Sequence, residues 1–485
     1  VGSRPAGLIC WDDIVFMSDP ETKPLIPMTK FLTVCFLYCL SVIGLNGQVQ
    51  RPNLVIIMTD DQGYGDVGFN GCKDIPTPHI DRIAREGIRF TNGYVTYPVC
   101  SPSRAGLITG RYQGRFGYRR NPTLNPFDEM AGLPLEEENI AEILHKVGYH
   151  TGIIGKWHLG THPKYRPNVR GFDEFYGFVA GGHRYFPEDL IYPDIESVDR
   201  KGGWYNTKLL RNETRVETDE YLTDEFSNEA VEFIDRNAEK PFLLYLTYNA
   251  PHTPMQASQK YLDRFTHIEE ELRRTYAAMV SAVDDGVGRV LDKLDEHDLA
   301  ENTLVFFLSD NGGATNNGSI NAPLRGKKGT VYEGGLRVPF AFRWTGKIPS
   351  GVDYDHPVSS MDMLGTMVGL TGVEVAAERP LDGVNLMPFL AGENSGAPHD
   401  YLFWRMFDKE HAAVRSGSDK LVTLDPENDT SLYRISDDID ESSDISNANP
   451  ERTDLLDKKL KEWSSQLKPA IFDPLGTWDP SVPRE

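Results

Sequence analysis

The stretch around Cys100 combines a thiol, a predicted helix start and a cation. Pro102 and the helix-compatible residues after it predict a helix that begins near Cys100, because proline is well accepted in a first helical turn. Free backbone N–H groups gather at a helix start and favour a negatively charged group there. Arg104 lies four residues on and shares that helix face. The alternative interpretation of Cys100, a small buried apolar residue, stays open here.

Four short apolar runs each end in polar residues. Residues 53–59 are continuously apolar and branched, which is typical of a parallel strand covered on both faces. Similar runs occupy residues 149–154, 242–246 and 304–308. The carboxyl ends of parallel strands meet at one edge of an open α/β sheet, where such sheets build their sites. The polar residues predicted at that edge are Asp60, Asp61, Lys156, His158, His252, Asp310 and Asn311.

Helical patterns alternate with these runs. Residues 135–147 carry apolar residues on one face, and residues 268–297 form a longer helical pattern. Alternating strands and helices predict a three-layer α/β sandwich with a central, mostly parallel sheet. We assign this catalytic domain to residues 51–380.

The character of the sequence changes near residue 381. Residues 401–406, 412–416 and 420–424 are short strand-like pieces, and residues 452–467 resemble a helix. The pattern predicts a small α+β subdomain with an irregular tail, within residues 381–485.

A glycine-rich loop, residues 324–339, carries two adjacent lysines. Its glycines permit tight turns and close backbone approach. Lys327 and Lys328 would ordinarily face solvent in such a loop, and the loop composition by itself assigns neither of them to a site.

The first residues predict export. Residues 28–47 have a short basic start, an apolar run and small residues for cleavage, as in a secretory signal peptide. The run is too short for a membrane span, so we expect no transmembrane anchor and a secreted or periplasmic protein. Residues 1–27 are interpreted as a non-structural upstream extension. Behind the predicted cut only Cys72 and Cys100 remain, so the fold would not depend on an internal disulfide.

The charge balance limits the partners. The chain has 485 residues and a formal net charge of −22. A nucleic acid partner is excluded, because phosphate contacts need dense basic surface. A small anionic substrate stays compatible with a local positive pocket.

The segment 99–110, with Cys100, Pro102, Arg104 and a closing Thr109-Gly110 pair, resembles the signature of the type I sulfatases, of the alkaline phosphatase superfamily. Five blocks in the family's order extend the resemblance from residue 51 to 424, and the chain looks most like secreted bacterial carbohydrate sulfatases. The resemblance implies the superfamily's fold. It also implies that a separate maturation enzyme oxidises Cys100 to formylglycine, an aldehyde that acts as its hydrate.

The resemblance further implies a bound divalent cation. Its ligands would be Asp60, Asp61, Asp310, Asn311 and the modified residue at Cys100. Oxygen donors suit a hard ion, Ca²⁺ first and Mg²⁺ second. In the family, such an ion helps to make the hydrated aldehyde a nucleophile at neutral pH.

The remaining roles also come from the resemblance. His158 would be the base that lets sulfate leave, Arg104 would hold the hydrated aldehyde, and Lys156 and Lys328 would bind sulfate oxygens. The leaving oxygen would be protonated by His252 or by Lys328, and the sequence does not choose between them. Taken alone, each histidine is equally compatible with a packing role.

A sulfated poly- or oligosaccharide is the expected substrate. His183, Arg184, Trp404 and Arg405 are candidate contacts, because sugar rings stack on aromatic side chains and anions meet arginine. The aromatic residues in these stretches are equally compatible with packing. Two other functions remain open: a phosphodiester or phosphonate monoester hydrolase with the same type of site, and a catalytically dead, carbohydrate-binding relative.

Overall fold

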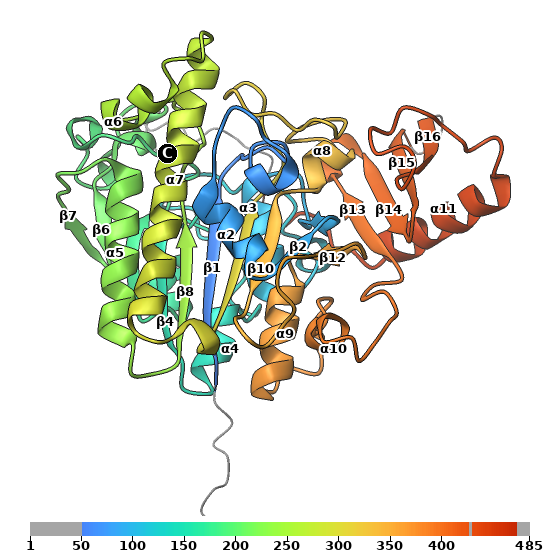
Figure 1. Cartoon of the computed structure of the whole chain (residues 1–485), viewed down its shortest axis with the longest axis horizontal. Helices are drawn as coiled ribbons and strands as arrows, with labels where there is room; N and C mark the ends of the chain where they lie inside the picture. Colours follow the sequence, from blue (N-terminus) through green and yellow to red (C-terminus); the bar gives the residue numbers. More distant parts are fainter. Residues whose placement is uncertain (1–50, 426–428, 473–485) are drawn as a thin grey trace, which may run out of the picture. The chain divides into compact units, whose positions relative to one another are not determined.

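A central ten-stranded sheet organises the chain. The computed structural model describes residues 51–425 and 429–472, and these described residues pack as one compact unit. In spatial order, the strands are β11 (Val352–Tyr354), β2 (Ile88–Phe90), β10 (Phe340–Arg343), β9 (Thr303–Ser309), β1 (Asn53–Thr59), β8 (Phe242–Thr247), β4 (His150–Lys156), β5 (Glu174–Phe178), β6 (Leu209–Arg211) and β7 (Thr214–Val216) (Figure 1).

The sheet is mostly parallel, as predicted. Neighbouring strands from β9 to β5 pair in parallel, whereas β10 and β6 pair antiparallel with both of their neighbours. The four predicted strand runs correspond to β1, β4, β8 and β9, with ends shifted by two residues at most. In the register, Met58 pairs with Leu308 on one side and Thr247 on the other, so β1, β8 and β9 end at the same edge.

Helices cover both faces of the sheet, which confirms the three-layer architecture. All seven residues of β1 are buried, and because side chains alternate along a strand, they supply two cores. Leu54 and Ile56 join the core that contains α3 (Cys100–Thr109), α4 (Ile140–His145) and α9 (Asp362–Thr371). Val55 and Ile57 join the core with α2 (Pro78–Arg85), α5 (Leu222–Asn237) and α7 (Glu271–Glu296).

The helix predictions differ in accuracy. The helix predicted over 268–297 is α7 with small end corrections. The helix predicted over 135–147 is wrong in length, since α4 begins only at Ile140. Asn139 fixes this start, because its side chain accepts hydrogen bonds from the backbone N–H groups of Ala141 and Glu142.

The C-terminal part forms a separate antiparallel sheet, in the order β13 (Leu402–Arg405), β14 (Ala412–Ser416), β15 (Asp419–Asp425) and β16 (Asp429–Arg434). The last strand was not predicted. Helix α11 (Pro450–Ser464) packs on one face through Leu456, Leu460 and Trp463. Shorter elements are α6 (Gln259–Leu262), α8 (Glu333–Leu336), α10 (Met387–Leu390) and the paired β3 (Gly93–Tyr94) and β12 (Val358–Ser359).

Several predictions stay untested. The predicted leader and extension, residues 1–47, lie outside the described residues, as do residues 473–485. The domain boundary at residue 381 stays a prediction. Among the described residues, no helix combines the length and apolar character that a membrane crossing needs.

Candidate active site

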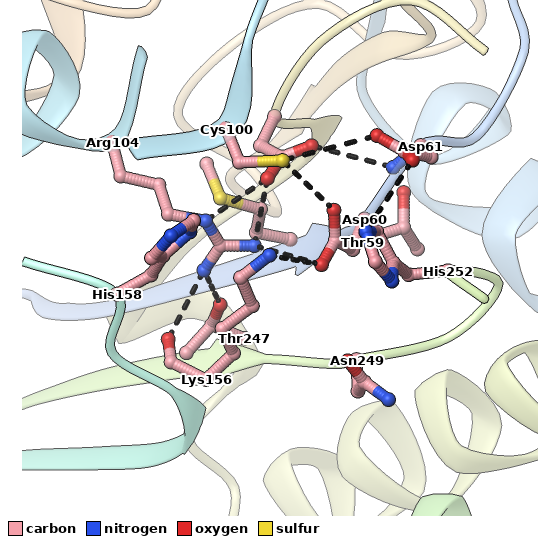
Figure 2. Close-up of polar contacts among 12 residues, drawn as sticks. Thr59, Asp60, Asp61, Cys100, Arg104, Lys156, His158, Thr247, Asn249 and His252 are labelled. Atoms are coloured by element: carbon pink, nitrogen blue, oxygen red, sulfur yellow. Dashed lines mark hydrogen bonds and ion pairs between the residues drawn. The ribbon is translucent and has the colours of Figure 1, made fainter. Parts of the chain in front are cut away.

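The ends of β1 and β9 and the start of α3 bring four potential ligands together. Ligand atoms of Asp60, Asp61, Cys100 and Asp310 all lie within 4.8 Å of one another, and all four residues are buried. Figure 2 labels three of these residues, Asp60, Asp61 and Cys100. Asp60 and Asp61 follow β1 directly, and Asp310 follows β9. Cys100 is the first residue of α3, as predicted. Parallel pairing of β1 with β9 therefore joins residues about 250 positions apart.

The donor set fits a hard divalent cation. Three buried carboxylates at one point repel one another, and burial together with Asp60 raises the pKa of Asp310 to about 6. Asn311 donates from Nδ2 to Asp61 Oδ1 at 2.7 Å, while its Oδ1 is buried with no hydrogen-bond partner. An unpaired buried acceptor beside three carboxylates is what a cation ligated by oxygen would satisfy.

Two lysines face the carboxylates. Lys156 is fully buried and its Nζ binds Asp60 Oδ2. Lys328 Nζ lies 2.7 Å from Asp61 Oδ1 and 3.1 Å from Cys100 Sγ. Burial alone would raise the pKa of Asp60, but Lys156, with His252, Arg104 and Lys328, holds it below its usual range. The loop lysine that points inward is thus Lys328.

Cys100 lies between the acids and the lysines. Its Sγ is 3.5 Å from Asp60 Oδ1 and 3.9 Å from Asp61 Oδ1. Burial raises the pKa of the Cys100 thiol far above its ordinary value, although Lys156 and Lys328 oppose the shift. An unmodified cysteine at this position therefore stays a neutral thiol, which is a poor nucleophile.

Arg104 holds Asp310. The guanidinium lies 2.9 Å from Asp310 Oδ2 through both Nε and Nη2, and Nη1 donates to the carbonyl of Lys156 at 3.0 Å. Nη1 also binds the hydroxyl of Thr247 at the end of β8. Arg104 is completely buried. In this arrangement Arg104 orients an acidic ligand, a contact that its helix position did not predict.

The two histidines border the same cluster. His158 adopts a left-handed φ of 58°, and its Nδ1 is buried without a hydrogen-bond partner. Burial, with Lys156 and Arg104, lowers the pKa of His158 well below the ordinary value, so its imidazole is neutral near pH 7. His252 Nδ1 donates to the Thr253 carbonyl at 2.6 Å, and its Nε2 lies 3.7 Å from Asp61 Oδ2.

Two predicted substrate contacts need correction. His183 is completely buried, and its ring nitrogens bond the carbonyls of Arg184 and Thr207 at 2.9 and 2.7 Å. Trp404 is 2% exposed, and its Nε1 donates to the Val95 carbonyl at 2.7 Å. Neither side chain has an atom free for a sugar, because both rings are enclosed in cores. The packing interpretation applies to both.

The structure adds Tyr205, which the sequence analysis missed. Tyr205 lines a pocket of about 260 Å³ together with Arg184, Asn206, Thr253 and Pro254. Burial, followed by Asp60 and Cys100, raises the pKa of Tyr205 to about 12. A side chain at Gly182 would meet the Tyr205 ring, and one at the adjacent Gly181 would meet the His158 ring, so the pocket lies beside the cluster. No strand-end or motif signal marks this loop tyrosine.

At one edge of the sheet, the site combines acids that can hold a cation, lysines that can bind an anion and a neutral histidine that can accept a proton. Together with the fold, this arrangement defines a hydrolase that acts on the ester of a tetrahedral oxyanion. Residues 52–373 match the family described as "Sulfatase". The chain belongs to the sulfatase family, enzymes that hydrolyse sulfate esters and generally use formylglycine and a divalent cation. Residues 327–468 match "N-sulphoglucosamine sulphohydrolase, C-terminal".

Similar proteins agree with this assignment. N-acetylgalactosamine-6-sulfatase of Canis lupus familiaris is 36% identical over 367 residues, 72% of this chain and 68% of that protein. The crystal structure of Ps i-CgsB in complex with k-i-k-neocarrahexaose is 39% identical, with a TM-score of 0.82 over 87% of this chain and 94% of the other. The PsFucS1 sulfatase from Pseudoalteromonas sp. is 26% identical, with a TM-score of 0.75 over 91% and 94%.

Proposed function

We propose that the protein removes sulfate from a sulfated poly- or oligosaccharide outside the cytoplasm, as a secreted or periplasmic enzyme. One observation carries the proposal: Asp60, Asp61, Asp310 and Cys100 converge in a buried cluster that Lys156 and Lys328 flank. Relatives that share at least a quarter of the sequence include a structure with a bound neocarrahexaose and a sulfatase named for N-acetylgalactosamine 6-sulfate. These names support a carbohydrate substrate.

The catalytic residue is proposed to be formylglycine, made from Cys100 by a maturation enzyme. The hydrated aldehyde would supply the nucleophile. A divalent cation held by Asp60, Asp61, Asp310 and Asn311, Ca²⁺ or Mg²⁺, would supply positive charge next to the sulfate. Arg104 keeps the Asp310 carboxylate in place through its two 2.9 Å contacts.

The other residues bind the sulfate and move protons. Lys156 and Lys328 hold sulfate oxygens and balance their charge in a water-poor site. His158 accepts a proton at its imidazole, which is neutral at neutral pH because of burial. The leaving oxygen takes its proton from His252 or from Lys328, and both stay in the proposal. Arg184 and Tyr205 line the pocket in which the sugar would lie.

The experiment is a screen of purified, matured protein against defined sulfated oligosaccharides, with released sulfate assigned to its position on the sugar. We expect turnover of at least one sulfated sugar, and faster turnover of an aryl sulfate than of the matching aryl phosphodiester. Faster phosphodiester hydrolysis would reverse the assignment. An intact mass that shows an unmodified thiol at Cys100 in the native host, together with no turnover, would support a dead, carbohydrate-binding protein.

A further inference from the structure

Two arginines next to the catalytic loop lack an acidic partner. Arg119 is 6% exposed, yet its guanidinium forms no hydrogen bond or ion pair with any described residue, and its Nε is buried. The half-buried Arg405 also has a buried, unpaired Nε and no carboxylate contact within the described chain. In contrast, the equally buried Arg170 bonds Glu142 and two backbone carbonyls. Buried guanidinium groups are normally satisfied, so this pair needs an explanation.

The surroundings of the pair are positively charged. Arg119 lies over the ring of Phe407 at 4.6 Å, and Arg120 lies over the same ring at 5.7 Å. Asp408 is the acid that faces this group, and its carboxylate already binds Arg120 Nε. Burial, followed by the charges of Arg405 and Arg120, lowers the pKa of Arg119. Within the described chain, Asp408 thus pairs with Arg120, and no carboxylate contacts Arg119 or Arg405.

The segment that carries Arg119 is close to Cys100 in the structure. Tyr97 donates its hydroxyl to the Arg119 carbonyl at 2.8 Å. The residues on either side of Arg119 and Arg120 bind Ser101, which follows Cys100: the Tyr118 hydroxyl lies 2.7 Å from Ser101 Oγ, and Asn121 Oδ1 accepts the Ser101 N–H at 3.1 Å. Hydrogen bonds therefore connect the segment around Arg119 to the start of α3.

The segment after Arg405 reaches the other side of the same site. Lys409 Nζ donates to the carbonyl of Gly329 at 3.4 Å, and Gly329 follows the inward-pointing Lys328. The Gly329 N–H in turn donates to the Pro98 carbonyl at 2.8 Å. The loop with Lys328, the start of α3 and the segment that follows Arg405 thus border one another.

We propose that Arg119 and Arg405 form a second anion subsite, which binds another sulfate or a carboxylate of the same substrate molecule while Lys156 and Lys328 hold the sulfate that is removed. The proposal rests on the proposed function, because it assumes a carbohydrate with several anionic groups. The planar guanidinium matches both oxyanions with paired hydrogen bonds. An anion from the substrate would also offset the cost of burying unpaired cations. The enzyme would therefore select polyanionic substrates.

The test compares substrates with one and two anionic groups. Wild-type protein is assayed on a small aryl sulfate and on two oligosaccharides of the same length, one carrying a single sulfate and one carrying two. We expect Arg405→Gln to lower kcat/KM for the disulfated oligosaccharide by about tenfold or more, since hydrogen bonds to charged groups contribute at this scale. Because the aryl sulfate has no second anionic group, its kcat/KM should fall by at least about fivefold less than kcat/KM for the disulfated oligosaccharide.

A matched control separates this effect from a general loss of positive charge. Arg89→Gln removes a guanidinium on strand β2 that is paired with Asp353 on the edge strand β11, and it should leave the turnover of all three substrates unchanged. Arg119→Gln should act like Arg405→Gln. If that buried variant does not fold, the more exposed Arg405→Gln carries the test. An equal loss on mono- and disulfated oligosaccharides, or no loss, would overturn the subsite.

Binding measurements distinguish the two proposals. Titration with the disulfated oligosaccharide should show about tenfold weaker binding to Arg405→Gln than to wild type, whether or not sulfate is released. Absent turnover of every sulfated carbohydrate would contradict the proposed function, while this binding difference would still support the subsite. Inorganic sulfate is the second probe: if it protects wild type but not Arg405→Gln against thermal unfolding as well as the oligosaccharide does, the subsite serves free sulfate and the substrate claim is wrong.

Discussion

Single residues at the sheet edge depend on one another for their position. Asp310 follows the buried strand β9, and its carboxylate is held by Arg104 at 2.9 Å. Its Oδ1 also accepts the backbone N–H of Asp61 at 3.3 Å. An acid so placed contributes charge and geometry to the site and little to the apolar core. Its replacement by an isosteric amide should therefore affect activity far more than folding.

Asp310→Asn should lower kcat by roughly 100-fold or more. Even the loss of a group that only supports a metal ligand lowers metal affinity or activity by about 10- to 100-fold. The variant should also bind less divalent cation, measured by elemental analysis after dialysis. Its circular dichroism spectrum should match wild type. Asp285→Asn is the control, since Asp285 lies on α7 and pairs with Arg264, away from the cluster. Unchanged turnover and metal content in Asp310→Asn would contradict the cation site.

At the scale of elements, α9 is fixed at its start by Asp362. The buried carboxylate accepts the backbone N–H groups of Ser359 and Val384 at 2.8 and 2.9 Å. His399 Nε2 lies 2.9 Å from both of its oxygens. Burial alone would lower the pKa of His399, but Asp362, with Asp382 and Asp400, raises it. The loop that carries His399 is thus attached to α9 by an ion pair that depends on pH.

This pair should make stability depend on pH in a defined direction. Because the pKa of His399 is raised in the folded state, its stabilisation is complete below the ordinary histidine value of about 6.5 and is lost as pH rises through the raised value. The difference in free energy of unfolding between wild type and His399→Gln should be largest near pH 6 and shrink toward pH 9. Urea titrations at both pH values measure it. A difference that grows with pH would show that the pair is misassigned.

For the whole molecule, a buried ionic group joins the C-terminal sheet to the catalytic part. Lys420 on β15 is completely buried, and its Nζ lies 2.8 Å from Glu333 Oε1 and 2.9 Å from Glu441 Oε1. Glu333 begins α8, shortly after the loop that carries Lys328. Tyr94 donates its hydroxyl to the other oxygen of Glu333 at 2.6 Å. The small sheet therefore supports the catalytic loop through this group.

Lys420→Met should destabilise the protein by about 3–5 kcal/mol, because it removes the cation that the buried carboxylates of Glu333 and Glu441 share. We also expect lower kcat/KM, since the loop with Lys328 loses its support. Denaturant unfolding and aryl sulfate turnover measure the two effects. Lys458→Met is the control: Lys458 is 73% exposed and lies 4.0 Å from Glu462 on α11, where a surface pair contributes about 1 kcal/mol at most. Equal stability of both variants would argue against a structural role for the buried group.

Local patterns predicted much of the architecture. The continuous apolar run at 53–59 matches β1 residue for residue, because a strand buried on both faces leaves a signal along the chain itself. The helix start at Cys100 was predicted for a similar reason. The start of the helix predicted over 135–147 was wrong, since the side chain of Asn139 outweighed the apolar pattern before it. Strand β16 was missed because it is polar in its first half and partly exposed.

The sequence by itself determined the type of chemistry: which strands end in acids or bases, and the thiol four residues before an arginine. Only the tertiary structure decided which of these groups meet, that Arg104 binds Asp310, and that His183 and Trp404 are enclosed in cores. The physical reason is the distance along the chain over which each effect acts. Periodicity and capping are set by neighbours along the chain, whereas burial and charge pairing depend on strands and loops that meet across hundreds of residues.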